Sequence, residues 1–138
     1  MSNTLPTTTL GGTNLVVTRL GYGAGHRKHM DNIQQEKVLN LILDAGINFI
    51  DTADMYEGYD RYLGSPGGIA EMILGEALKD RRECAFITSK VGNPVGNSDY
   101  KGKGLSRTHI IHQIDASLNR LQSDYVDFYE MHRPDPET

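Results

Sequence analysis

Apolar residues follow two spacings along the chain, short continuous runs and helical repeats. Four runs rich in β-branched and aromatic residues are predicted as strands, at 19–25, 47–53, 84–92 and 125–134. Between them, apolar residues recur every three or four positions, as one face of a helix requires. They are Val38, Leu39, Leu41, Ile42 and Ala45 in the first helix, Ile69, Met72, Ile73, Ala77 and Leu78 in the second (which also carries Glu76), and Ile110, Ile111, Ile114, Leu118 and Leu121 in the third.

Capping residues support the same boundaries. Asp31 or Asn32 can accept a hydrogen bond from a free backbone N–H at the start of the first helix, and Ser106 can do so for the third. Gly46 tolerates the left-handed conformation that ends a helix. The basic residues of KDRR (79–82) suit the C-terminal end of the second helix. Pro134 is expected to stop the last strand.

The predicted order is β-α-β-α-β-α-β, an α/β arrangement. Each crossover is long enough to hold a helix, so the strands should be parallel. Before them, TTTLGGTNLVVTRL has the pattern of a β-hairpin around Gly11-Gly12-Thr13-Asn14. No linker or low-complexity segment interrupts the pattern. We therefore expect one domain over 1–138, with a hairpin in 1–18 and four parallel strands with three helices in 19–138.

Two parallel architectures fit this order, an open doubly wound sheet and a (β/α)8 barrel. In both, chemistry collects at the carboxyl ends of the strands. The first architecture, a Rossmann-type dinucleotide-binding domain, is suggested by the glycine-rich stretch Gly21-Tyr22-Gly23-Ala24-Gly25. However, His26 follows in place of a helix start, and Asp51 lies 30 residues after Gly21 where the fingerprint places its acid about 20 residues on.

Composition narrows the function classes. A net charge of −4 and 23% charged residues are typical of an ordinary globular protein, and no basic stripe suggests nucleic-acid binding. No apolar run approaches the roughly 20 residues of a membrane span, and the N-terminus lacks a signal-peptide pattern. Cys84 is the single cysteine, so no intrachain disulfide can form. We expect a cytoplasmic protein that contacts neither membrane nor nucleic acid.

Ionisable residues stand at or just after successive strand ends. Asp51 closes the second predicted strand, Lys90 the third and His132 the fourth, while Tyr56 lies on the loop after Asp51. Each has an ordinary explanation alone, such as a turn cap for Asp51 or a solvated rim side chain for Lys90. In a parallel sheet all four emerge on one rim, and that joint arrangement is difficult to attribute to chance.

The four residue types form a plausible proton-donating group. A phenol is a poor acid at neutral pH, but a nearby ammonium favours the phenolate, and a carboxylate holds the ammonium in place. Lys90 and Asp51 would thus make Tyr56 a general acid, and a neutral imidazole of His132 could orient a carbonyl oxygen toward it. No side chain donates hydride, so an organic cofactor must supply it.

The same stretches resemble the aldo-keto reductase family. The similar segments are LGYGAG (20–25), DTADMY (51–56), ITSKVG (87–92) and DYVDFYEMHRPD (124–135), and the resemblance runs from the hairpin to the end of the chain. It implies a (β/α)8 TIM barrel represented by its first half, and NADPH-dependent reduction of aldehydes or ketones, or the reverse oxidation of alcohols. It also implies a catalytic tetrad of Asp51, Tyr56, Lys90 and His132, with Tyr56 as the proton donor to a small-molecule carbonyl substrate. The residues implied near NADP(H) are Gly21, Gly23, Asp51 and Lys90.

The chain length departs from that pattern. A complete barrel takes about 250 residues, and the 138 residues here supply at most four βα strands. The outer strands would be open edges, which predicts self-association. The alternatives are therefore a fragment or split-gene product, two copies that close a barrel together, or a non-catalytic half-barrel that serves as a scaffold or regulatory module.

Two long glycine-rich segments and two histidine pairs complete the candidates. Segments 57–71 and 93–106 are expected as rim loops, the first offering Tyr59 and Tyr62 to a substrate pocket and the second resembling a lid. The pairs His26/His29 and His109/His112 have metal-ligand spacing but no visible third ligand. We interpret them as solvated histidines and expect no metal site.

Overall fold

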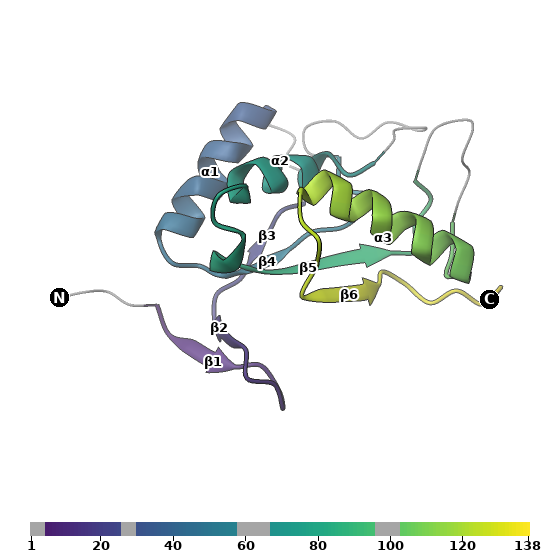
Figure 1. Cartoon of the computed structure of the whole chain (residues 1–138), viewed down its shortest axis with the longest axis horizontal. Coiled ribbons are helices and arrows are strands. Elements are labelled where there is room, and N and C mark those ends of the chain that lie inside the picture. Colours follow the sequence, from purple (N-terminus) through teal and green to yellow (C-terminus); the bar gives the residue numbers. More distant parts are fainter. Residues whose placement is uncertain (1–4, 26–29, 58–66, 96–102) are drawn as a thin grey trace.

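The computed structural model describes residues 5–25, 30–57, 67–95 and 103–138. A small hairpin and a larger parallel sheet with three helices make up this part of the chain (Figure 1). In chain order the elements are β1 (Thr7–Thr9), β2 (Val16–Thr18), β3 (Tyr22–Gly23), α1 (Asn32–Asp44), β4 (Phe49–Asp51), α2 (Ile69–Leu78), the 3₁₀ turn η1 (Arg82–Cys84), β5 (Phe86–Val91), α3 (Arg107–Leu121) and β6 (Phe128–Met131).

The element order confirms the predicted alternation. Strands β1 and β2 pair antiparallel, and the larger sheet has the order β3-β4-β5-β6 with every neighbouring pair parallel. The strands are shorter than the predicted ranges. At the start of the third range, Cys84 belongs to η1, and in the fourth range the ladder begins only at Phe128. Beside β4, the flanking residues Ile47, Thr52 and Ala53 are buried although they lie outside the ladder, so that apolar run is longer than its strand.

The helix caps follow the sequence. Asp31 accepts a hydrogen bond from the Gln34 N–H, and the Gln34 side chain accepts one from the Asp31 N–H, which completes a capping box. Ser106 caps α3 by accepting from the N–H of His109 at 3.3 Å. Gly46 follows the end of α1 with φ +83°, the left-handed conformation that glycine tolerates.

The register divides the large sheet into two faces. Because successive side chains of a strand point to opposite sides, Ile50 and Ile87 share one face, and both are fully buried against the helices. Figure 1 shows α1, α2 and α3 together on that one side of the sheet. The other face, called here the inner face, carries Phe49, Asp51, Phe86, Thr88, Lys90, Phe128 and Glu130.

The inner face holds all three phenylalanines of the chain toward the amino ends of the strands. Phe49 pairs in register with Phe86, and the rings of Phe49 and Phe128 meet edge to face with centroids 6.1 Å apart. All three side chains are half-buried. In the part of the chain that the structure describes, this apolar surface has no helix over it.

The main core lies between the helices and the sheet. Its fully buried members include Leu74 and Leu78 of α2 beside Ile50 and Ile87. Helices α2 and α3 approach closely at Gly75, where a Cβ atom would lie 2.5 Å from the carbonyl oxygen of Arg120. Only glycine permits that approach.

The predicted core faces of the helices were partly wrong. In α1, Leu41 is 69% exposed, and the buried positions are Gln35 and Leu39. In α3 the buried row is mostly polar, consisting of His109, Gln113, Ser117 and Leu121 at intervals of four. The isoleucines at 110 and 114 and Leu118 are only half-buried beside it, and Ile111 is exposed. His109 is therefore not a solvated histidine.

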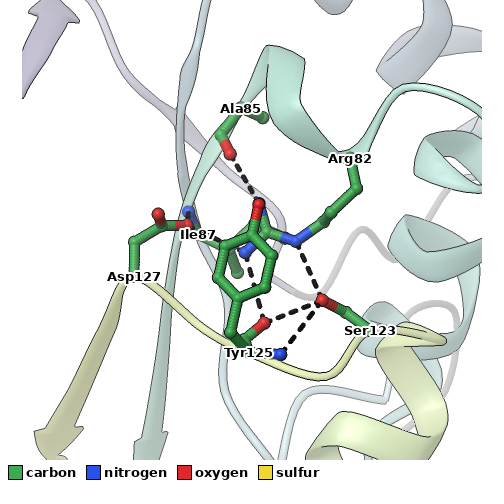
Figure 2. A network of polar contacts seen from close by, with 6 residues as sticks. All are labelled: Arg82, Ala85, Ile87, Ser123, Tyr125 and Asp127. Atoms are coloured by element: carbon green, nitrogen blue, oxygen red, sulfur yellow. Dashed lines mark hydrogen bonds and ion pairs between the residues drawn. The ribbon is translucent and has the colours of Figure 1, made fainter.

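Arg82 ties η1 to the start of β6 (Figure 2). Its guanidinium donates to the Ala85 carbonyl at 2.7 Å and to the Asp127 carboxylate at 2.9 Å, and its carbon lies 4.0 Å from the centroid of the Tyr125 ring. The same carboxylate oxygen accepts the N–H of Ile87 at 2.8 Å. Arginine suits this role because its planar fork can donate several bonds while it stacks on an aromatic face.

Replacing Arg82 with Ala should therefore destabilise the fold. The change leaves the Asp127 carboxylate, only 14% exposed, without its cation, and we expect a loss of about 2–4 kcal/mol in unfolding free energy. Urea denaturation monitored by circular dichroism measures it. Lys79→Ala is the matched control, because its pair with Glu76 is long and exposed, and should cost less than about 0.5 kcal/mol. Equal losses in the two variants would contradict the role of Arg82.

Candidate functional site

The four predicted strand-end residues gather at the carboxyl rim of the sheet. Asp51 is the last residue of β4, Lys90 the last but one of β5, and His132 follows β6 directly. Tyr56 lies on the turn after β4, where its N–H donates to the Ala53 carbonyl at 3.2 Å. The alternation of the strands places Asp51 and Lys90 on the inner face, because Asp51 pairs in register with Thr88.

Lys90 is the centre of the group. Its ammonium nitrogen lies 2.6 Å from Asp51 Oδ1 and donates to the Thr52 carbonyl oxygen at 2.7 Å. The Lys90 side chain is 13% exposed and that of Asp51 44%. Since the carboxylate is open to solvent, the pair adds little stability, and its main effect is to fix the position of the ammonium.

Tyr56 and His132 complete the group. The ammonium of Lys90 lies 5.1 Å from the centroid of the Tyr56 ring, within the range of a cation–π contact. The rings of Tyr56 and His132 meet edge to face, with centroids 5.8 Å apart and an interplanar angle of 88°. A carboxylate, an ammonium, a phenol and an imidazole therefore form one contiguous cluster, which is a suitable arrangement for moving a proton to an oxygen.

The glycines implied as cofactor contacts lie at the neighbouring strand. Gly23 pairs in register with Asp51, and a Cβ atom there would meet nothing within 4 Å. A Cβ on Gly21 would lie 3.2 Å from the Phe49 carbonyl oxygen, so this glycine serves packing between β3 and β4. Space at the rim is thus found beside Gly23, next to the open side of Asp51.

A second polar cluster lies behind the rim, between the sheet and the helices. Glu71 of α2 is fully buried and pairs with the Arg120 guanidinium of α3 at 2.7 Å. The Ser89 hydroxyl donates to its other oxygen at 2.5 Å, and Arg120 also donates to the Ser117 hydroxyl at 3.1 Å. The buried carboxylate thus has both an opposite charge and hydrogen bonds, as a charge inside a protein requires.

Asp54, on the turn between Asp51 and Tyr56, adjoins this cluster and has no exposed surface. Burial and the nearby charge of Glu71 raise the pKa of Asp54 to about 7, against opposing effects of Arg120, the Met55 N–H and Lys90. Burial, followed by the charges of Asp54 and Glu71, also raises the pKa of Tyr129 on β6. Glu71 and Arg120 thus act on the ionisation of both Asp54 and Tyr129.

Sequence reasoning missed this second cluster, although two signals were present. Glu71 shares the apolar side of its helix with Leu74 and Leu78, three and seven positions on, and a carboxylate there needs a buried partner. The segment DTAD also carries two acids, of which only Asp51 was considered. Nothing in the spacing pointed to Arg120, which lies 49 residues from Glu71.

Several other candidates fall outside the described residues. Tyr59 and Tyr62, the pair His26/His29 and residues 96–102 of the proposed lid are among them. Within the described residues, no group of three metal-ligating side chains occurs. In the same residues, no helix is long and apolar enough to cross a bilayer.

Comparison with known proteins assigns the fold. The family model described as Aldo/keto reductase family matches residues 19–138. The chain belongs to this family. Among solved structures it is similar to the holo form of the aldo-keto reductase AKR11C1 from Bacillus halodurans, with a TM-score of 0.74 and 31% identity over 93% of this chain and 40% of that one. The apo form of the same enzyme gives a TM-score of 0.67 and 28% identity. The parallel sheet with its helices is accordingly part of a TIM barrel, and the expected fold class is confirmed.

Curated relatives give the same alignment. Proteins named "Probable voltage-gated potassium channel subunit beta" from Oryza sativa subsp. japonica and Arabidopsis thaliana are each 37% identical over 94% of this chain. The chain spans 38% of the length of either relative. It therefore corresponds to well under half of each of these two relatives.

The second cluster yields a stability prediction. Arg120→Met should leave Glu71 as an unpaired buried charge, and we expect a loss of about 3–5 kcal/mol in unfolding free energy. Arg107→Met, at an exposed position in the first turn of the same helix, is the matched control and should cost less than about 1 kcal/mol. Urea titrations measure the unfolding free energy of both variants. A loss in Arg120→Met as small as that in Arg107→Met would mean that Arg120 does not stabilise the buried Glu71 carboxylate.

Proposed function

We propose that this chain carries the reducing site of an NADPH-dependent oxidoreductase that converts aldehydes or ketones to alcohols, or runs the reverse oxidation. The observation that supports it is the cluster of Asp51, Tyr56, Lys90 and His132 at one rim of a sheet that belongs to the aldo/keto reductase family. All four residue types needed to protonate a carbonyl oxygen are present and adjacent.

In this proposal Tyr56 donates the proton. Its ring contacts both the Lys90 ammonium and the His132 imidazole, so both groups are near an oxygen that gains negative charge beside the phenol. Asp51 and the Thr52 carbonyl hold the ammonium in place. His132 would orient the carbonyl oxygen by hydrogen bonding.

NADPH would be held near Gly23, Asp51 and Lys90, with Gly21 behind them. The open space at Gly23 and the exposed side of the Asp51 carboxylate suit a polar group of the cofactor. When bound, NADPH supplies hydride to the carbonyl carbon. The exposed thiol of Cys84 suits a reducing compartment, and we infer a cytoplasmic location.

The proposal predicts that Tyr56→Phe removes the proton donor and keeps the cofactor site. We expect aldehyde reduction to fall about 10²–10⁴-fold, while NADPH affinity stays within about threefold, because the phenol contributes to the chemical step rather than to uniform binding. The rate is followed by NADPH absorbance and the affinity by NADPH fluorescence. Tyr125→Phe, at the opposite end of the sheet, is the control and should keep the full rate. Wild-type turnover by Tyr56→Phe would refute the assignment.

A second candidate function is a regulatory module without turnover. The names of the plant relatives, which describe channel subunits, favour it. NADPH titration separates the two candidates. A reductase should change the fluorescence of NADPH on binding, whereas a bare scaffold should leave it unchanged.

We also propose that the isolated 138-residue chain self-associates through the sheet. The half-buried phenylalanines of the inner face and the edge strands β3 and β6 are the surfaces that support it.

Sedimentation should therefore show a mass that rises with concentration in the micromolar range. Phe128→Lys, which adds a charge to the inner face, should remain monomeric because an unpaired ammonium opposes burial. The exposed change Ile111→Lys on α3 is the control and should associate like the wild type. A wild-type chain that stays monomeric at every concentration would rule out the association.

A further inference from the structure

The carboxyl group of Asp54 is a buried titratable group that the proposed proton transfer does not use. It has no exposed surface, and neither of its oxygens has a hydrogen bond of good geometry among the described residues. A carboxylate in such a place is costly, whereas a neutral carboxylic acid is tolerated. Asp54 is also only two residues from Tyr56 and three from Asp51.

The backbone of Asp54 builds the turn that presents Tyr56. Its N–H donates to the Lys90 carbonyl at 3.2 Å. Its carbonyl oxygen lies against Gly67, where an added Cβ atom would approach it to 2.5 Å. Tyr56 is then fixed at both ends, donating to the Ala53 carbonyl and accepting from the Ala70 N–H at 2.9 Å. In this closed turn the Asp54 side chain is fully buried.

We propose that Asp54 is a positioning residue for Tyr56, which holds a proton while the turn is closed and loses it when the turn opens toward water. This inference deepens the proposed function and depends on it for the role of Tyr56 as proton donor. The neutral form of Asp54 keeps the phenol beside Lys90. The ionised form is stable only if water reaches it, and that requires the turn to move.

The ionisable groups that act on Asp54 or are affected by it lie on α2, α3, β5 and β6. Glu71 of α2 disfavours its ionisation, while Arg120 of α3 and Lys90 of β5 favour it. Tyr129 of β6 contributes a neutral buried phenol, whose hydroxyl has no hydrogen-bond partner among the described residues. The Glu71 carboxylate is already paired with Arg120, so this cation is shared and cannot fully compensate a second buried carboxylate.

The direction of the pH effect follows from proton binding. The pKa of Asp54 is about 7 in the folded chain, against an ordinary value of 3.8. Between these values the folded state binds more protons than the unfolded state, so stability falls as pH rises. The contribution of Asp54 to stability is fully present below about pH 4 and is lost as pH rises through about 7.

The test follows the ring of Tyr56 by NMR in a chain with ¹³C-labelled tyrosine, its signal assigned by its loss in Tyr56→Phe. In the wild type the signal should shift in one step centred near pH 7. In Asp54→Asn, which stays neutral, that step should vanish, and the fall in stability with pH should flatten. If Asp54 only supported the fold, its replacement would change the spectrum at every pH and the step near pH 7 would remain. Asp44→Asn, at an exposed carboxylate, is the matched control and should keep it.

Infrared spectroscopy of the unmodified chain provides a test that needs no variant. A buried carboxylic acid should give a C=O band that disappears as pH rises through about 7. Absence of that band, a flat Tyr56 signal, or a step that persists in Asp54→Asn would each overturn the proposal. None of these measurements uses cofactor or substrate, so a chain that reduces no carbonyl would refute the proposed function without obscuring the state of Asp54.

Discussion

The ion pair between Asp51 and Lys90 is the contact on which the rim depends. It forms because β4 and β5 are parallel neighbours with Asp51 opposite Thr88, so that Lys90, two residues further on, emerges on the same face and reaches back over the strand end. The Thr52 carbonyl gives the ammonium a second acceptor. Since Asp51 is open to solvent, the pair contributes position more than stability. Without this pair, only the Thr52 carbonyl and the Tyr56 ring, of the described residues, would hold the Lys90 ammonium in place.

The sequence was sufficient to predict the order of elements and the convergence of the rim. Strand-like runs separated by helical repeats can form parallel crossovers, and parallel strands bring their carboxyl ends together. The sequence was not sufficient to predict which polar side chains are buried. Hydrophobic periodicity reports which residues avoid water, and it assigned Ile111 to the core of α3 while the buried row contains Gln113 and Ser117. A polar side chain is buried where a partner from another element satisfies it, and that partner is distant in sequence.

The two faces of the sheet differ in how completely their apolar side chains are buried and their charged groups are paired. On the helix face, Ile50 and Ile87 pack into a closed core, and the buried charge of Glu71 has both a cation and hydrogen bonds. On the inner face, the rings of Phe49 and Phe128 contact each other, and all three phenylalanines remain half-buried. A barrel buries such rings with side chains from opposite strands, and the chain corresponds to about 40% of the solved relative AKR11C1 from Bacillus halodurans. The helix face can therefore be stable by itself, whereas the inner face needs further surface to complete it.

Strand β5 connects these two environments. Ser89 points to the helix face and bonds Glu71, while its neighbour Lys90 points to the inner face and bonds Asp51. The carbonyl of Lys90 also accepts the N–H of Asp54, so the turn that carries Tyr56 is attached to the same strand. Two adjacent residues of β5, Ser89 and Lys90, thus contact the buried acid cluster on one face and the proton-donating rim on the other. Because the interior screens charges less than water does, a change of charge at Asp54 is felt by Lys90. Strand β5 therefore holds contacts of both the buried acid cluster and the rim.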